Sequence, residues 1–284
     1  MGANILIMDT SAAIPLSIGI APDLLDRNST IPDNQLPKSY LDLLSHLPSK
    51  LISEIHIPNS VVQEWIGYSC FMEDGKLKAV RTVPEYEMYA GYDNALRFLQ
   101  FALAGTTNGH PKIVIDCSPE GTDYVKKYLD LPLGGKEREE ALNKLRQEDG
   151  LHIGEWDCAQ LAYDHLAKYK SSATVLMDDN GGLDMLARER WHYHKNYGIW
   201  PNIGTVNSRA MLEAMDKSGM LWQAGFKDDV RELDISQQLV EEQNLYAKQL
   251  GNDRNYYIPN IRAEGKGFAD SLKRVIHPGN GFMR

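Results

Sequence analysis

Several acidic side chains follow short apolar runs, and these are the residues whose types and spacing indicate chemistry. Asp9 closes the run NILIMD, and the pair Asp178 and Asp179 closes ATVLMDD. Glu64 lies in EIHIPNSVVQEW and Asp157 in GLHIGEWDCAQLAYDH. Clustered carboxylates repel one another, so a fold tolerates them only with a cation among them or with raised pKa values. Oxygen ligands suit Mg²⁺ or Mn²⁺, which can activate water for phosphodiester cleavage with one or two metals.

Each acid also has a purely structural interpretation. Asp9 precedes TSAAI and is suited to cap a helix, as are Asp178 and Asp179 before the next helical pattern. Glu64 taken alone fits a surface glutamate, and Glu155 in a first helical turn suits the helix dipole. The signal is therefore the set of acids on separate elements rather than any single member.

The elements that must position these acids alternate between two patterns. Short apolar runs predict strands at 4–9, 54–57, 111–117, 173–179 and 203–206. Helical patterns lie at 39–47, 93–104, 121–129, 137–147, 155–168, 183–190, 208–217 and 234–250, with further helix starts after Asp9 and at Asn59 or Ser60. This alternation predicts an α/β fold with a mostly parallel sheet. Sites in such sheets form at the carboxyl ends of the strands, where Asp9 and the Asp178/Asp179 pair are expected.

The length of 284 residues fits one large domain, or one domain with an extension. We expect a domain over 1–233, in which the long segment 67–109 is an insertion carrying its own helices. The pattern changes after Arg231, so 234–284 is expected to form a C-terminal helix followed by a turn-rich basic tail.

The amino-acid composition limits which binding partners and which cellular compartment are expected. A formal net charge of −9 is unusual for a protein held to nucleic acid by charge alone, so a polyanionic partner would require local basic patches or bound cations. The three cysteines show no regular spacing, which favours a reducing compartment. We find no apolar run of about 18 residues and no basic region before an N-terminal apolar run, so we expect a cytoplasmic protein without membrane contact.

Basic and aromatic residues interleave in ARERWHYHKNYGIWPN, directly after the last acid. Aromatic faces stack on unpaired bases and cations contact phosphates, so Arg188, Arg190, Trp191 and Lys195 are candidate RNA contacts. A partly buried helix end with a solvated basic face is the alternative. The net-basic run 262–284 is open to three interpretations: an RNA contact, an arm that binds a partner, or a solvated tail.

The acid-bearing segments, taken in order, resemble the PIN-domain ribonucleases, within them the VapC toxin-like branch. The matching segments are ILIMDTSAAI, IHIPNSVVQEW, GLHIGEWDCAQLAYDH, VLMDDNGGLDMLARE and IGTVNSRAMLEAMDKSGML. The resemblance implies a three-layer sandwich in which helices flank a central, mostly parallel sheet. It covers much of 1–233, while the long middle segment and the C-terminal extension depart from the pattern.

The resemblance also implies a function and a site. It implies a metal-dependent endoribonuclease with Mg²⁺ or Mn²⁺ among Asp9, Glu64, Asp157 and one of Asp178 and Asp179, of which Asp179 aligns better. Supporting residues by the same resemblance are Thr10 and Ser11 through their hydroxyls, and Glu155 as a further ligand or outer carboxylate. The implied partners are an RNA substrate, an antitoxin protein as in toxin–antitoxin systems, and a second copy of the chain in a homodimer.

Two other readings stay open. The first is a non-catalytic PIN-like scaffold that binds RNA or protein. The second is a different aspartate-rich α/β protein, either a receiver or a haloacid-type phosphohydrolase. DTSAA lacks the second aspartate that such phosphohydrolases carry two residues after the first. A receiver needs an acidic pair near the chain start and a lysine at a late strand end, and neither is evident.

Overall fold

The computed structural model describes residues 4–33, 35–45, 47, 51–82, 89–105, 111–117, 153–169, 172–252 and 255–265. The helices expected at 121–129 and 137–147, and the tail from 266 onward, lie outside the described residues. So does part of the expected insertion at 67–109.

A central sheet organises the described chain, in the strand order β5-β2-β1-β6-β7-β8. Its members are β1 (Ile5–Met8), β2 (Glu54–Pro58), β5 (Lys112–Asp116), β6 (Ala173–Leu176), β7 (Ile203–Val206) and β8 (Ala263–Glu264). All pairs are parallel except β7 with β8. Every residue of β1, β6 and β7 is buried, as expected for strands covered on both faces. The predicted strands and the mostly parallel sheet are confirmed.

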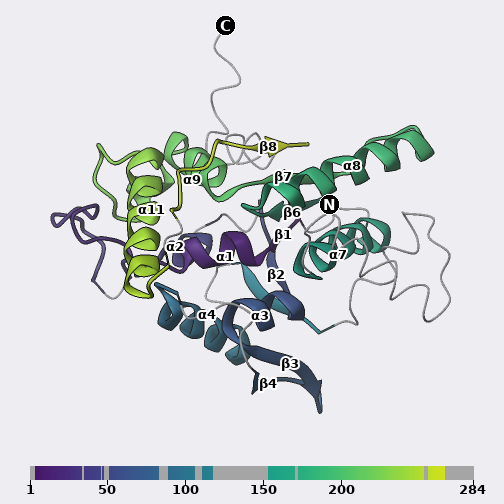
Figure 1. The fold of residues 1–284 in the computed structure, drawn as a ribbon, viewed down its shortest axis with the longest axis horizontal. Helices are drawn as coiled ribbons and strands as arrows, with labels where there is room; N and C mark the ends of the chain where they lie inside the picture. The colour runs from purple at the N-terminus through teal and green to yellow at the C-terminus, as the bar shows by residue number, and fades with distance from the viewer. Residues whose placement is uncertain are drawn as a thin grey trace, which may run out of the picture.

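Helices cover both faces of this sheet and make a three-layer α/β sandwich (Figure 1). They are α1 (Thr10–Leu16), α2 (Tyr40–Ser45), α3 (Asn59–Ile66), α4 (Tyr92–Ala104), α7 (Ile153–Tyr169), α8 (Asn180–Tyr197), α9 (Ser208–Lys217), α10 (Met220–Gln223) and α11 (Glu232–Gln249). The fold class predicted from the sequence is therefore confirmed. None of the helices in the described part of the chain is long and apolar enough to cross a membrane.

The middle segment contains a hairpin that the sequence analysis did not predict. Strands β3 (Tyr68–Glu73) and β4 (Lys76–Arg81) pair antiparallel. Their hairpin follows α3 and lies at the bottom of the view in Figure 1. Asp74 and Gly75 join them with φ values of 50° and 71°, which is the backbone of a two-residue hairpin turn. Of the helices expected in this segment, the structure describes α4.

The strand order places a topological switch between β1 and β6. From β1 the chain passes through α1 to β2 on one side, whereas from β6 it passes through α8 to β7 on the other. Met8 is level with Leu176 in the parallel ladder, so the residues after these two strands emerge together. Open α/β sheets bind ligands at such a point, beyond the carboxyl ends of the strands.

The C-terminal part of the described chain packs on the same edge. Helix α11 packs against α9 and α1. The yellow segment after α11 in Figure 1 then crosses to β8, which lies beside β7. We call residues 255–265 the C-terminal strap.

Candidate functional site

A cavity of about 780 Å³ opens at the switch point between β1 and β6. Carboxylates from separate elements line it together with residues of the C-terminal strap. The acids are Asp9, Glu64, Glu155, Asp178 and Asp179. The structure thus brings together four of the five acids expected as metal ligands, and with them Glu155, which the resemblance implied as a further ligand or outer carboxylate.

Asp9 follows β1 and is 2% exposed. It caps α1, because its Oδ2 accepts hydrogen bonds from the Ser11 backbone N–H at 2.9 Å and from the Ser11 hydroxyl at 2.6 Å. The Ser11 oxygen also accepts from the backbone N–H groups of Asp178 and Asp179, at 2.9 and 3.1 Å. Ser11 therefore ties the loop after β6 to the first acid, and the capping role and the cavity position coexist.

Glu64 lies on α3 and is 4% exposed. Its Oε2 accepts from the Thr10 hydroxyl at 2.8 Å, and its Oε1 accepts from the Gly154 N–H at 3.3 Å. Gly154 belongs to the first turn of α7, where free N–H groups favour a carboxylate. A Cβ on Gly154 would come within 2.9 Å of Glu64 Oε2 and 3.4 Å of Asp9 Oδ1, so any other residue here would displace the Glu64 carboxylate.

Glu155 is the acid that α7 delivers to the cavity. It is 6% exposed, and its Oε2 has no hydrogen-bond partner among the described residues. A Cβ on Gly182 would lie 2.9 Å from Glu155 Cγ and 2.2 Å from Met177 Sδ, so the start of α8 packs directly on this side chain.

The two aspartates after β6 have different surroundings. Asp178 accepts from the backbone N–H and the hydroxyl of Ser208, through one oxygen each, which joins β6 to α9. Asp179 is exposed and caps α8, with its Oδ1 accepting from the Gly182 N–H at 2.8 Å. Asp178 is therefore committed to the fold, whereas Asp179 stands at the solvent side of the cavity.

Burial and mutual repulsion raise the pKa values of these acids. The pKa of Glu155 rises to about 9, first because of burial and then because of the Asp9 charge. Burial also raises the pKa of Asp9. Hydrogen bonds from Ser11 lower it in part, and the nearby charge of Asp179 raises it further. Burial raises the pKa of Asp178 to about 6 against the hydrogen bonds from Ser208. Such shifts are common where a site concentrates like charges.

The carboxylates are held by hydrogen bonds rather than converging on one point. Within the described ranges, no three side chains of His, Cys, Asp or Glu form a group that could hold a metal ion as they stand. Thr10, Ser11 and Ser208 each engage one acid. The Cys158 thiol beneath Asp9 is fully buried, and burial raises its pKa far above the usual range, so it stays a protonated core residue.

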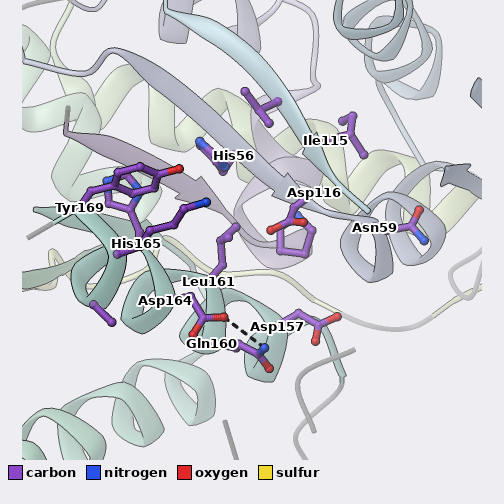
Figure 2. A pocket seen from close by; sticks show the side chains of 14 residues that line it. His56, Asn59, Ile115, Asp116, Asp157, Gln160, Leu161, Asp164, His165 and Tyr169 are labelled. Atoms are coloured by element: carbon purple, nitrogen blue, oxygen red, sulfur yellow. Dashed lines mark hydrogen bonds between the residues drawn. The ribbon is translucent and has the colours of Figure 1, made fainter. Parts of the chain in front are cut away.

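Asp157 does not reach the acidic cavity. It accepts a hydrogen bond from the Ser60 hydroxyl and lines a second cavity of about 680 Å³ between α7 and strands β2 and β5. Figure 2 shows Asp157, Gln160 and Asp164 along one side of α7, with His56 and His165 deeper in. Residues two positions apart in a helix differ by about 200° around its axis, so Glu155 and Asp157 face nearly opposite sides of α7. Of these two acids of α7, Glu155 lines the acidic cavity and Asp157 lines the second one.

The candidate RNA contacts on α8 lie outside the residues that line the acidic cavity. Trp191 is 49% exposed, and Lys195 Nζ lies 5.2 Å from its ring centroid. Arg188 is exposed as well. Arg190, in contrast, is 8% exposed and pairs with Glu264 at 3.6 Å, so in this structure it anchors β8 and does not face solvent.

The structure adds cavity residues that the sequence analysis missed. Ser208 and Arg209 begin α9, and Tyr256 and Tyr257 belong to the strap. Ser208 follows an apolar strand run, which is a detectable signal for a residue at the sheet edge. The strap residues carry no comparable signal, because their position depends on a return of the chain from α11.

Comparisons of the chain with known protein families, with curated proteins and with solved structures found no match.

Proposed function

We propose that this chain is a metal-dependent endoribonuclease of the PIN type, hydrolysing RNA phosphodiester bonds at the acidic cavity. One observation carries the proposal: four separate elements each bring a carboxylate to the topological switch point of the sheet. The loop after β1 brings Asp9, α3 brings Glu64, α7 brings Glu155 and the loop after β6 brings Asp179. A packed fold gains nothing from such repulsion, which supports a functional origin.

The donor set fits a hard divalent cation such as Mg²⁺ or Mn²⁺. Asp9, Glu64, Glu155 and Asp179 supply only oxygen, which is the ligand class these ions prefer. Glu155 Oε2 has no hydrogen-bond partner within the described part of the chain, and burial raises the pKa values of Glu155 and Asp9. Positive charge in the cavity would relieve both effects. A bound divalent ion would supply Lewis acidity and a water of lowered pKa.

The chain's own residues then divide the remaining tasks. Thr10 holds the Glu64 carboxylate and Ser11 holds that of Asp9, so both are oriented before substrate arrives. Asp179 stands at the solvent side, where a carboxylate can orient an attacking water and accept its proton. Both oxygens of Asp178 accept hydrogen bonds from Ser208, so we assign Asp178 the role of joining β6 to α9. We do not include Asp157 among the ligands.

The remaining parts of the proposal rest on the resemblance to PIN-domain ribonucleases. From it we propose RNA as the substrate, an antitoxin protein or a second copy of the chain as partner, and a cytoplasmic location. The three cysteines are free in this structure, which agrees with that compartment.

The alternative is a non-catalytic PIN-like scaffold that binds RNA or protein. Its support is specific: Asp9, Glu64 and Asp178 already accept hydrogen bonds from hydroxyl and backbone donors of the chain. A scaffold would retain the acids for these links alone, and Asn or Gln substitutions would then change stability but no activity.

Cleavage of total RNA by the purified full-length chain, in Mg²⁺, in Mn²⁺ and in EDTA, separates the two proposals. Variants Asp9→Asn and Asp179→Asn test the cavity, and Asp157→Asn is the matched control on the opposite side of α7. We expect metal-dependent cleavage that falls at least 100-fold in the two cavity variants, as for other lost catalytic groups. Asp157→Asn should stay within about threefold of the original chain, since Asp157 lines the second cavity rather than the acidic one.

Circular dichroism verifies that each variant is folded. Metal-independent cleavage, or equal loss in Asp157→Asn and Asp179→Asn, would contradict the assignment of the cavity. Absence of cleavage together with an unchanged metal titration between the original chain and Asp179→Asn would favour the scaffold.

A further inference from the structure

The C-terminal strap forms one wall of the acidic cavity. Tyr256, Tyr257, Ile258, Pro259 and Asn260 line it together with the five carboxylates. The wall therefore combines aromatic and backbone surface with the place where the proposed chemistry occurs.

Hydrogen bonds from both sides of the cavity hold the strap in place. Asn244 of α11 accepts from the Tyr256 N–H at 2.6 Å and donates to the Tyr256 carbonyl at 3.2 Å. Asn207 before α9 donates through its amide to the Asn260 carbonyl at 2.6 Å. Arg209 donates to the Pro259 carbonyl at 2.9 Å. Tyr257 sits between these anchors, so its backbone position is fixed.

The side chain of Tyr257, however, is 80% exposed. Large aromatic side chains usually bury their rings, because burial of that surface is a main source of stability. A ring exposed to this degree, on a backbone held by flanking hydrogen bonds and at the rim of a cavity, is placed for contact with a ligand.

The charges of the cavity indicate how that ligand must be bound. The lining holds five carboxylates, whereas Arg209 is its one cationic side chain among the described residues. Arg209 is also engaged, with Glu232 at 3.8 Å and with Pro259. Ion pairing with the described side chains of the lining therefore contributes little, and an anionic strand gains from a contact that does not depend on charge, such as base stacking on an aromatic ring.

From these observations we infer that Tyr257 stacks on an unpaired base of a single-stranded RNA whose backbone passes over the acidic cavity. The inference rests on the proposed function and names a residue that positions its substrate. Bases within a duplex already stack on their neighbours and leave no face for the ring, so paired RNA cannot use this contact. Tyr257 is thus a substrate-positioning residue rather than a catalytic one.

Binding and cross-linking experiments test the inference on the full-length chain. The background is Asp9→Asn, which retains a capping side chain and prevents turnover in Mg²⁺. The probe is a fluorescein-labelled single-stranded oligouridine, followed by fluorescence anisotropy, with a duplex of equal length as comparison. We expect Tyr257→Ala to raise Kd about tenfold, as for the loss of one base–aromatic stack. Tyr257→Phe should restore binding, and Trp222→Ala, which removes an aromatic ring 62% exposed and outside the cavity lining, should change nothing.

A second readout locates the contact. The same oligonucleotide carrying 5-iodouridine should cross-link on irradiation to the peptide that contains Tyr257, and the cross-link should vanish in Tyr257→Ala. In the cleavage-competent chain, Tyr257→Ala should raise KM for single-stranded RNA with kcat nearly unchanged.

The outcomes separate this inference from the proposed function. Equal binding of single-stranded probe with and without Tyr257→Ala overturns the stacking contact, even if the chain cleaves RNA. Tyr257-dependent binding in a chain that never cleaves RNA overturns the nuclease proposal and leaves the stacking contact standing. No binding of the single-stranded probe, or tighter binding of the duplex, overturns the inference outright.

Discussion

The carboxyl of Glu155 predicts a measurable conflict between stability and function. Its pKa in the folded chain is about 9 against an ordinary value of 4.5, because burial and the charge of Asp9 disfavour ionisation. Between these two values the folded chain holds a proton that the unfolded chain has released. The free energy of unfolding therefore falls by about 1.4 kcal/mol for each pH unit as the pH rises through this window. At a pH of about 7.5 the accumulated loss reaches about 4 kcal/mol.

Glu155→Gln removes this titration and keeps the shape of the side chain. We expect the variant to be about 2–4 kcal/mol more stable than the original chain at a pH of about 7.5, the lower figure allowing for a less favourable hydrogen bond of the amide. The advantage should shrink towards a pH of about 5 and grow up to a pH of about 9. Urea unfolding followed by circular dichroism, in EDTA at three pH values, measures it.

A control variant and a comparison with added Mg²⁺ show whether the effect comes from Glu155. Glu73→Gln, at an exposed glutamate of the β3–β4 hairpin, is the matched control and should change the free energy of unfolding by no more than about 0.5 kcal/mol, as for other surface substitutions. Added Mg²⁺ should stabilise the original chain more at high pH than at low pH, since ligands bind a metal only when deprotonated, and should stabilise Glu155→Gln less. A difference between Glu155→Gln and the original chain that is constant with pH, or a variant less stable at high pH, would refute the argument from burial.

Two further predictions concern the contacts that support the cavity. Gly182→Ala should lower the free energy of unfolding by about 1–3 kcal/mol and reduce cleavage, because its Cβ would lie 2.2 Å from Met177 Sδ and 2.9 Å from Glu155 Cγ; an unchanged melting temperature would show that the start of α8 can shift freely. Ser208→Ala should cost about 1–2 kcal/mol at a pH of about 8 and less at a pH of about 5, because the lost hydroxyl serves the Asp178 carboxylate, which ionises above its pKa of about 6; equal losses at both pH values in urea unfolding would contradict that role.

The strands and their closing acids were predictable from the sequence because fully buried parallel strands leave a plain pattern. Apolar runs such as ILIM before Asp9 and VLM before Asp178 end abruptly at a carboxylate, and the strands Ile5–Met8 and Ala173–Leu176 are confirmed there. Once the sheet is parallel, chain topology alone brings Asp9 and the Asp178/Asp179 pair to one edge. The position of these acids at the sheet edge therefore followed from the strand pattern and the parallel topology.

The choice between Glu155 and Asp157 was not predictable in the same way. In α7, apolar and small residues occur around most of the helix, so the pattern defines its inward side poorly. Cys158, Leu161, Ala162 and His165 recur at helical spacing, so the sequence pattern alone suggests an inward stripe that Asp157 flanks. In the structure the buried set begins earlier, at Gly154 and Glu155, and Leu161 is only half-buried. A rotation of part of a turn exchanges one acid for the other, and the packing of α7 against α3 and the sheet fixes that rotation.

The strap was unpredictable for a different reason. Strand β8 has two residues, and its pairing with β7 spans a long separation along the chain. Local patterns carry no information about such a return. The β3–β4 hairpin, in contrast, had a readable Asp-Gly turn that the sequence analysis did not use.

The hydroxyl groups around the cavity show how the fold tolerates its acids and where it does not. Thr10 joins α1 to the Glu64 carboxylate of α3, Ser11 joins Asp9 to the loop after β6, and Ser208 joins Asp178 to α9. Each link neutralises part of a burial cost and at the same time connects two elements. Glu155 has no such donor at Oε2 among the described residues, and its pKa is raised to about 9. If the acids served only to connect elements, Glu155 would be the least useful of them. As a metal ligand Glu155 would have a clear role, because a divalent cation would stabilise its charged form. Removing its carboxylate should therefore raise the free energy of unfolding and weaken the stabilisation by Mg²⁺.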